Sequence, residues 1–270
     1  MMRLNRAALP AALGALVVLA SAAEQEPAPL DASAGFQAAE DPEALQGLLG
    51  RSDIAAAAPP SFRTRMRLTS SDRPEPAEIE VWRADGRTLV RFLGAQQRGK
   101  YLLYADAALW LIAPGAKKPV KLPRSFRLQG SASLDDILGF RYSRDYSISR
   151  AEAGRDADGP VVRLHLVARK PGMQYPEVLY VVRPEAGRPV SVELRLKSGK
   201  LATSLEFVEW FPGARLQPRL FVLRDRLRGA STTRVEVLTF EERIVPKGLF
   251  DLASGAERRR LEDEAPETRP

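Results

Sequence analysis

The feature that most constrains this chain is an alternation of apolar and polar residues, which recurs in many short segments separated by turn signals. In the segment 61–70, Phe62, Met66 and Leu68 share one face of an extended chain, whereas three arginines occupy the other. A side-chain period of two with one apolar face is typical of a half-buried β-strand. The alternation therefore predicts a mainly β protein.

The same alternation predicts a long series of strands after this first one. Further strands are expected at 76–84, 87–94, 100–105, 108–113, 145–152, 160–168, 177–184, 190–197, 200–210, 218–227 and 231–242. Turn signals such as Asp85-Gly86 and Ser198-Gly199 separate several of them, as they do in antiparallel hairpins. Strands at this spacing predict one large antiparallel sheet or barrel.

Two short helices are expected to interrupt the strands. Asp41 and Pro42 form a helix start, with Asp41 as the N-cap and Pro42 at the first helical position. The segment 133–138 is predicted to be a second helix, which Ser133 caps and Gly139 ends. The predicted fold class remains mainly β.

The ends of the chain differ from its strand-rich middle. Residues 1–23 hold two arginines, an apolar run and small terminal residues, which together predict a cleaved secretory signal peptide. The alternative is a membrane anchor, but the apolar run is shorter than the roughly 20 residues that span a bilayer. Residues 24–40 are predicted to be a flexible leader, 41–252 a single domain, and 253–270 a charged, disordered tail. The mature protein is thus expected to be soluble and periplasmic.

The composition leaves little room for catalysis. The chain has no cysteine and a single histidine, His165, which excludes disulfides, thiolate nucleophiles and multi-histidine metal centres. His165 lies in mid-strand on a face that it shares with arginines, so a surface position is favoured over a general base. No nucleophile elbow, phosphate-binding loop or dinucleotide fingerprint occurs. The sequence therefore predicts no enzyme, no metal and no cofactor.

The charge of the chain is modestly basic, at +7 from 41 Lys and Arg against 34 Asp and Glu. The basic residues are scattered along strands and often have acids nearby, which favours a solvated face over a nucleic-acid patch. An exported protein is not expected to bind nucleic acid. An anionic membrane surface is the better hypothesis for any basic patch.

A large apolar face on one side of the predicted sheet is the strongest candidate for a functional surface. It is either an ordinary filled core or a concave surface that holds an apolar ligand. Periodicity alone does not distinguish these alternatives. The candidate lipid-binding residues on this face are Phe62, Met66, Leu68, Ile79, Val81, Val90, Phe92, Leu102, Tyr104, Leu205, Phe207 and Val222.

Several short motifs, taken in their order along the chain, resemble a known family. They are the segments 99–103 (GKYLL), 108–114 (ALWLIAP), 121–123 (KLP), 130–137 (GSASLDDI) and 244–250 (IVPKGLF), together with Thr232-Thr233. The combination resembles the bacterial outer-membrane lipoprotein-sorting proteins, the LolA-like periplasmic carriers, and it covers about residues 60–252.

This resemblance implies both a fold and a function. The fold would be an open, half-closed antiparallel β-barrel with short covering helices. The protein would be a monomeric carrier of acylated lipoproteins or lipids toward the outer membrane, without catalysis, and an inner-membrane exporter is a possible partner. The family also implies a buried arginine that holds the covering helix shut, for which Arg83, Arg91 and Arg98 compete.

A second function from a different class is also open. A periplasmic sensor of the same fold would regulate a membrane protein by contact and not by carrying lipid. Such sensors usually have a second C-terminal domain, whereas only a charge-rich stretch of about 20 residues follows Phe250 here. A third reading, an exported hydrolase, is disfavoured by the lone histidine and the missing motifs.

Overall fold

The computed structural model describes residues 36–123, 126–138, 140–213, 216–227 and 231–252, together with 258 and 260. The chain separates into two units, Met1–Ala34 and Gly35–Pro270, and the description below concerns the second. The predicted signal peptide at 1–23 therefore lies outside the described residues, as do the first part of the predicted leader and most of the predicted tail.

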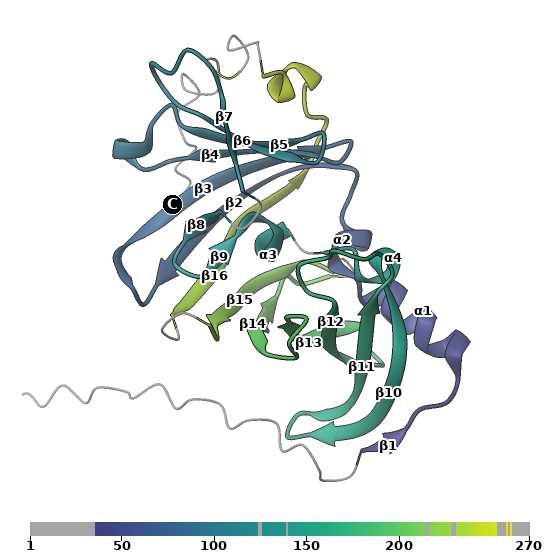
Figure 1. Cartoon of the computed structure of the whole chain (residues 1–270). Helices are drawn as coiled ribbons and strands as arrows, with labels where there is room; N and C mark the ends of the chain where they lie inside the picture. Colours follow the sequence, from purple (N-terminus) through teal and green to yellow (C-terminus); the bar gives the residue numbers. More distant parts are fainter. Residues whose placement is uncertain are drawn as a thin grey trace, which may run out of the picture. The chain divides into compact units, whose positions relative to one another are not determined.

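One antiparallel sheet dominates the molecule (Figure 1). Its strands, in the order in which they lie side by side, are β1 (Gln37–Ala38), β10 (Tyr146–Asp156), β11 (Gly159–Ala168), β12 (Glu177–Arg183), β13 (Arg188–Arg195), β14 (Leu201–Trp210), β15 (Pro218–Asp225), β16 (Thr232–Glu242), β2 (Ser61–Ser70), β3 (Arg73–Ala84), β4 (Arg87–Phe92), β5 (Tyr101–Ala105), β6 (Ala108–Ile112) and β7 (Val120–Leu122). Within the described residues β1 and β7 are the two edge strands and do not pair with each other, so the sheet is curved but not closed. The predicted open, half-closed antiparallel barrel is confirmed.

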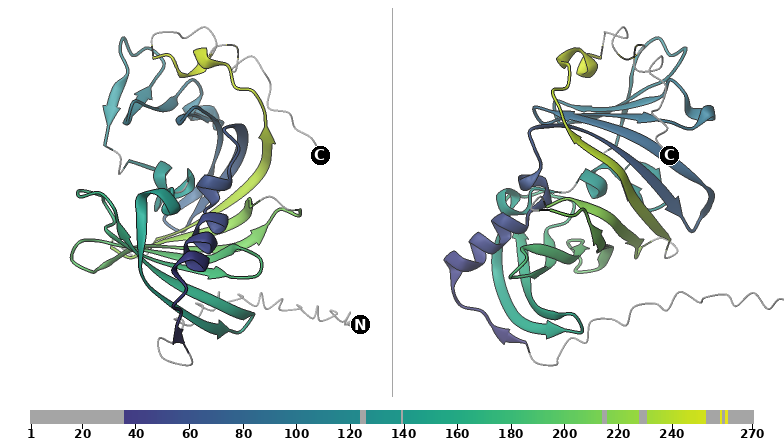
Figure 2. Two further views of the ribbon diagram at one scale, coloured as in Figure 1. Left: turned by 90° about the vertical axis from the view of Figure 1, so that its right-hand side faces the viewer. Right: turned by 180° about the vertical axis from the view of Figure 1, so that it is seen from behind.

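The pairing of β16 with β2 joins the two series of strands into one sheet. Thr233 lies opposite Ser70, and Val237 lies opposite Met66. These residues are far apart in the sequence, so no hairpin signal reports the contact. The pairing makes one continuous concave face from strands at both ends of the domain (Figure 2).

Short helices lie against this concave face. They are α1 (Pro42–Ser52), α2 (Ile54–Ala57), α3 (Leu134–Leu138) and α4 (Tyr142–Asp145), with 3₁₀ turns η1 (Ala95–Gln97) and η2 (Lys247–Phe250) elsewhere. Asp41 caps α1 as predicted, because its carboxylate accepts the backbone N–H groups of Glu43 and Ala44 at 3.1 and 3.0 Å. Ser133 caps α3, and its hydroxyl accepts the N–H of Asp136 at 3.2 Å.

A small second sheet carries α3 into the concavity. It pairs β8 (Arg127–Gln129) with β9 (Ala132–Ser133), and α3 follows directly. Gly130 turns this hairpin at a φ of 49°, and a side chain there would meet the Ser70 hydroxyl at 1.9 Å. The hairpin therefore approaches the large sheet as closely as a backbone without a side chain allows.

Residues 36–40, which the sequence assigned to a flexible leader, belong to the folded unit. Gln37 and Ala38 pair with β10, and the guanidinium of Arg163 lies 3.6 Å from the centre of the Phe36 ring. A two-residue edge strand is too short to show alternation, so the sequence pattern could not reveal it. Arg258 in the predicted disordered tail is also placed, and its backbone carbonyl accepts the Tyr101 hydroxyl at 3.0 Å.

The core lies on both faces of the sheet but unequally. The larger cluster fills the concave side, where strand residues pack against Leu48 and Leu49 of α1, Ile137 of α3 and Tyr142 of α4. A smaller cluster around Trp82 lies on the outer face beneath η2. None of the described helices is long and apolar enough to cross a membrane.

Candidate functional site

The concave face gathers most of the residues that the sequence proposed as lipid-binding. Eleven of the twelve lie on it, and most of them are buried in the larger core cluster, whereas Tyr104 and Phe207 are half-buried. The eleven are Phe62, Met66, Leu68, Ile79, Val81, Val90, Phe92, Leu102, Tyr104, Leu205 and Phe207. The strand register places them in lateral rows, such as Val81 beside Val90 and Val90 beside Leu102.

The placement of Val222 on this face is wrong. Phe221 and Leu223 belong to the concave cluster, so Val222 between them points to the outer face, opposite Glu206 in the neighbouring strand. Residues 220–223 are all apolar, and an uninterrupted apolar run conceals which residues point inward. The sequence analysis missed Phe221 and Leu223 for the same reason, although the register of Leu205 opposite Leu223 would have found them.

The covering helices fill most of the concave space. A cavity of about 40 Å³ lies beneath α2, between Ile54 and Ala55 of the helix and Phe62 and Met66 of β2. Ligand pockets in proteins usually measure about 300–1,000 Å³. We refer to this arrangement of the cover as the closed form, in which an acyl chain finds no room beneath α2 unless part of the cover moves.

A few hydrogen bonds hold α1 and α2 in place. The buried hydroxyl of Tyr180 donates to the Ser52 carbonyl at 2.5 Å, and burial raises the pKa of Tyr180 so that this proton stays on. The Asp53 carboxylate accepts the backbone N–H and the hydroxyl of Ser143 at 2.8 and 2.7 Å. These hydrogen bonds attach the cover to the rest of the protein at the Ser52–Asp53 junction between α1 and α2.

The three arginines that compete for the expected latch lie in different places. Arg91 lies on the outer face, where it pairs with Glu80 at 2.6 Å and stacks on Trp82. Arg98 is exposed after η1. Arg83 does point into the concavity, but among the described residues its guanidinium makes no hydrogen bond to the cover. Tyr180 and Ser143 make the hydrogen bonds to the Ser52–Asp53 junction described above.

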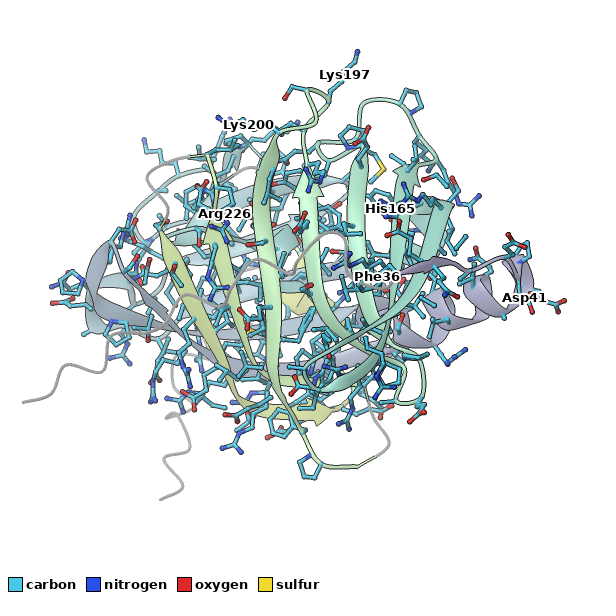
Figure 3. The ribbon with its side chains drawn as sticks, turned by 90° about the horizontal axis from the view of Figure 1, so that it is seen from below. Phe36, Asp41, His165, Lys197, Lys200 and Arg226 are labelled. Carbon is cyan, nitrogen blue, oxygen red and sulfur yellow. The ribbon has the colours of Figure 1, made fainter. Side chains whose placement is uncertain are left out.

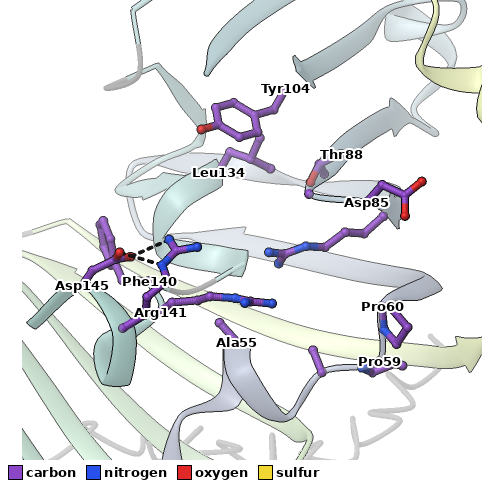
Figure 4. A pocket seen from close by; sticks show the side chains of 14 residues that line it. Ala55, Pro59, Pro60, Asp85, Thr88, Tyr104, Leu134, Phe140, Arg141 and Asp145 are labelled. Carbon is purple, nitrogen blue, oxygen red and sulfur yellow. Dashed lines mark hydrogen bonds and ion pairs between the residues drawn. The ribbon is translucent and has the colours of Figure 1, made fainter. Parts of the chain in front are cut away.

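A larger cavity of about 480 Å³ lies at one end of the concave face (Figure 4). Figure 4 shows Thr88 and Tyr104 of the sheet above it, Arg141 and Asp145 at one side, and Ala55 of α2 below. Its lining mixes apolar residues with several charged and polar ones, among them Arg83, Arg141 and Asp145. The sequence analysis did not single out this polar end.

His165 lies on the outer face, away from both cavities under the cover (Figure 3). Its side chain is 38% exposed, and Nε2 lies 3.5 Å from a Glu152 carboxylate oxygen. Partial burial lowers the pKa of His165, and the charges of Arg150, Arg163 and Arg195 lower it further. The imidazole is therefore neutral at pH 7, and no described hydroxyl lies in hydrogen-bond contact with Nε2.

Replacing His165 is expected to have almost no effect. His165→Ala should change the free energy of unfolding by no more than about 0.5 kcal/mol at pH 7, as exposed substitutions usually do. Because the folded-state pKa is depressed below 6.5, wild type alone should lose a little stability as the pH falls below that value. Chemical denaturation at pH 7 and 5 tests this. A loss of cellular function with unchanged stability would revive a catalytic role.

Comparison with known proteins adds a family model and several solved structures. A family model with the description "-like: Uncharacterized protein" matches residues 84–254, which is more than half of the chain. A search of curated protein sequences finds no match.

The solved structures share the fold at low sequence identity. A LolA superfamily protein from Nitrosomonas europaea is 23% identical, with a TM-score of 0.64, over 76% of this chain and 96% of that one. A DUF1329 family protein from Desulfovibrio piger is 15% identical, with a TM-score of 0.64, over 78% and 98% of the two chains. An outer membrane lipoprotein-sorting protein domain from Vibrio parahaemolyticus is 14% identical, with a TM-score of 0.60, over 82% and 97%.

Proposed function

We propose that this chain is a soluble periplasmic carrier that shelters acyl chains of lipoproteins or lipids during transfer toward the outer membrane. It belongs to the family whose model matches residues 84–254, and it shares its fold with LolA-like proteins. The observation that supports the proposal is the apolar concave face, which short helices cover in place of closing strands. Export would rest on the signal-like residues 1–23.

Uptake of an acyl chain would exchange one apolar contact for another. In the closed form, Leu48 and Leu49 of α1 and Ile137 of α3 cover the strand residues. A displaced cover would leave this face to the acyl chain, which gains about 0.8 kcal/mol per buried CH₂. A chain of fourteen carbons then gains about 11 kcal/mol, whereas each hydrogen bond at the Ser52–Asp53 junction contributes only about 1 kcal/mol.

The proposal is tested by looking for lipid on protein purified without detergent. Native mass spectrometry is expected to show a co-purifying lipid, and the delipidated protein should bind a fluorescent fatty-acyl probe. Bound probe should be displaced by unlabelled fatty acid. A clean apo mass, no probe binding and tight association with one membrane protein would instead support the sensor function.

A further inference from the structure

A row of polar side chains crosses one end of the apolar concave face. Phe62 lies opposite Arg83, Arg83 opposite Thr88, and Thr88 opposite Tyr104, so four adjacent strands contribute to the row. Because paired residues of antiparallel strands share a face, Arg83, Thr88 and Tyr104 all point into the concavity. In the next row along, Val81, Val90 and Leu102 take the places of Arg83, Thr88 and Tyr104. The face thus changes from apolar to cationic within one residue pair.

Two further arginines come from the cover above this row. Arg141 and Arg144 lie at the start and within α4, and both line the cavity of about 480 Å³ together with Arg83. Arg141 projects into it from the side opposite Thr88 (Figure 4). Sheet and cover therefore supply positive charge to the same space.

The aspartates that also line the cavity are already engaged. Asp145 accepts two hydrogen bonds from Arg144, both at 2.8 Å, and Asp85 lies 3.6 Å from the guanidinium of Arg87. Among the described residues, Arg83 and Arg141 have no carboxylate partner. Two guanidinium groups in one cavity are thus left without a counter-charge.

The cost of this arrangement indicates that it serves something other than stability. Burial lowers the pKa of Arg83, and the charges of Arg141 and Arg144 lower it further, so the folded protein disfavours the charge at this position. A half-buried guanidinium that repels its neighbours would be relieved by an anion. Planar guanidinium groups bind phosphate and carboxylate with paired hydrogen bonds.

The polar cavity adjoins the apolar one. Ala55 and Ala58 of the cover and Arg83 of the sheet line both, so no wall separates the two spaces other than these side chains. A single amphiphilic molecule could place its head in the larger cavity and its chains along the concave face. The larger cavity opens at the end of the sheet, beside Pro59 and Pro60.

We propose that Arg83 and Arg141 form a headgroup site for the phosphate of an anionic lipid whose acyl chains lie on the concave face. The inference rests on the carrier function proposed above and narrows its cargo to anionic lipids. Arg144 is held by Asp145 and acts as a neighbouring charge. Thr88 offers a hydroxyl donor on the same side of the cavity.

The test compares two lipids that differ only in their headgroups. Delipidated protein is incubated with vesicles of 1-palmitoyl-2-oleoyl phosphatidylglycerol or of the corresponding phosphatidylcholine, and the lipid that remains bound is measured after gel filtration. Both lipids carry a phosphodiester, but the quaternary ammonium of phosphatidylcholine is repelled by the guanidinium groups, so wild type should prefer the phosphatidylglycerol by about tenfold. Arg83→Gln and Arg141→Gln should each reduce this preference, and the double variant should abolish it.

Three controls keep the outcome specific. Arg155→Gln removes an exposed arginine on β10, remote in sequence from the cavity, and should leave the preference unchanged. Arg83→Lys keeps the charge and should retain part of the preference. Arg141 is exposed, so its variant reports on binding even if the Arg83 variants fold poorly.

The possible failures are distinguishable. Equal extraction of the two lipids, or a preference that survives in the double variant, overturns the headgroup site but leaves the carrier function intact. Inorganic phosphate that displaces the phosphatidylglycerol at micromolar concentration would indicate a site for soluble anions and overturn the lipid assignment. Extraction of neither lipid overturns the carrier function and this inference together.

Discussion

Asp53→Ala is expected to lower the free energy of unfolding by about 3 kcal/mol, from one lost helix cap and the lost charge-assisted bonds to Ser143. The Asp53 side chain is fully buried and has two tasks. Oδ1 accepts the N–H groups of Ala55 and Ala56, which starts α2, and Oδ2 accepts both donors of Ser143. Alanine leaves these donors without a partner inside the protein. The midpoint temperature of thermal unfolding should fall by about 6–12 °C for a domain of this size.

Asp41→Ala is the matched control for this prediction. Asp41 caps α1 with the same geometry, but its side chain is exposed and makes no described contact beyond that helix. Its loss should cost only about 0.5–1 kcal/mol. The two variants should also differ in function, because only Asp53 ties the cover to α4. Asp53→Ala should exchange a fluorescent acyl probe faster than wild type, and equal exchange rates in both variants would contradict a latching role for Asp53.

The strands could be predicted because each carries its own local signal. The alternation in β2 (Ser61–Ser70), the turn at Asp85-Gly86 and the cap at Ser133 all depend on neighbours within a few residues. The pairing of β16 with β2 depends on residues such as Thr233 and Ser70, which lie 163 positions apart. No local pattern encodes such a contact. The sequence therefore predicted a large sheet without showing which strands join its two series.

The inward direction of Arg83, at the polar end of the site, could have been predicted from the alternation in β3. Ile79, Val81 and Arg83 are spaced by two, so a strand that points the first two inward also points Arg83 inward. The sequence analysis treated Arg83 only as one of three possible latches. Its neighbours Arg141 and Arg144 follow the helix α3 in the chain, and only the folded structure brings them to the same cavity. Their convergence could not be predicted.

A disulfide between positions 131 and 233 is expected to block lipid uptake while it stabilises the protein. The hydroxyl oxygens of Ser131 and Thr233 lie 2.8 Å apart, and both residues are fully buried. Paired Cβ atoms in disulfides lie about 3.5–4.5 Å apart, which suits two side chains already in hydrogen-bond contact. The chain has no cysteine of its own, so Ser131→Cys with Thr233→Cys can form only this intramolecular bond.

The bond would fix the β8–β9 hairpin and α3 to β16. Leu134 of α3 lines the larger cavity and Ile137 lines the smaller one, so movement of this single helix would enlarge both. Fixing it should hold the concave face in the closed form, whose remaining space beneath α2 is about 40 Å³. Oxidised protein should therefore lose nearly all binding of the acyl probe.

Stability should change in the opposite direction. The disulfide would close a loop of about 100 residues, which stabilises a folded chain by up to about 4–5 kcal/mol in the loop-entropy model. The reduced variant should be slightly less stable than wild type, because the hydrogen bonds of Ser131 to Thr233 are lost. Higher stability with lower binding in the same oxidised sample separates a locked cover from a misfolded protein.

Reduction supplies the internal control. Dithiothreitol should restore probe binding to the double variant and leave wild type and the two single cysteine variants unchanged. An oxidised double variant that binds the probe as well as its reduced form would mean that α3 and its hairpin do not move during uptake. The acyl chain would then have to enter by displacement of α1 and α2 alone, where Tyr180 and Asp53 hold the junction. Such a result, combined with unchanged exchange in Asp53→Ala, would mean that the probe binds without movement of either part of the cover, and would overturn the covered concave face as the site of uptake.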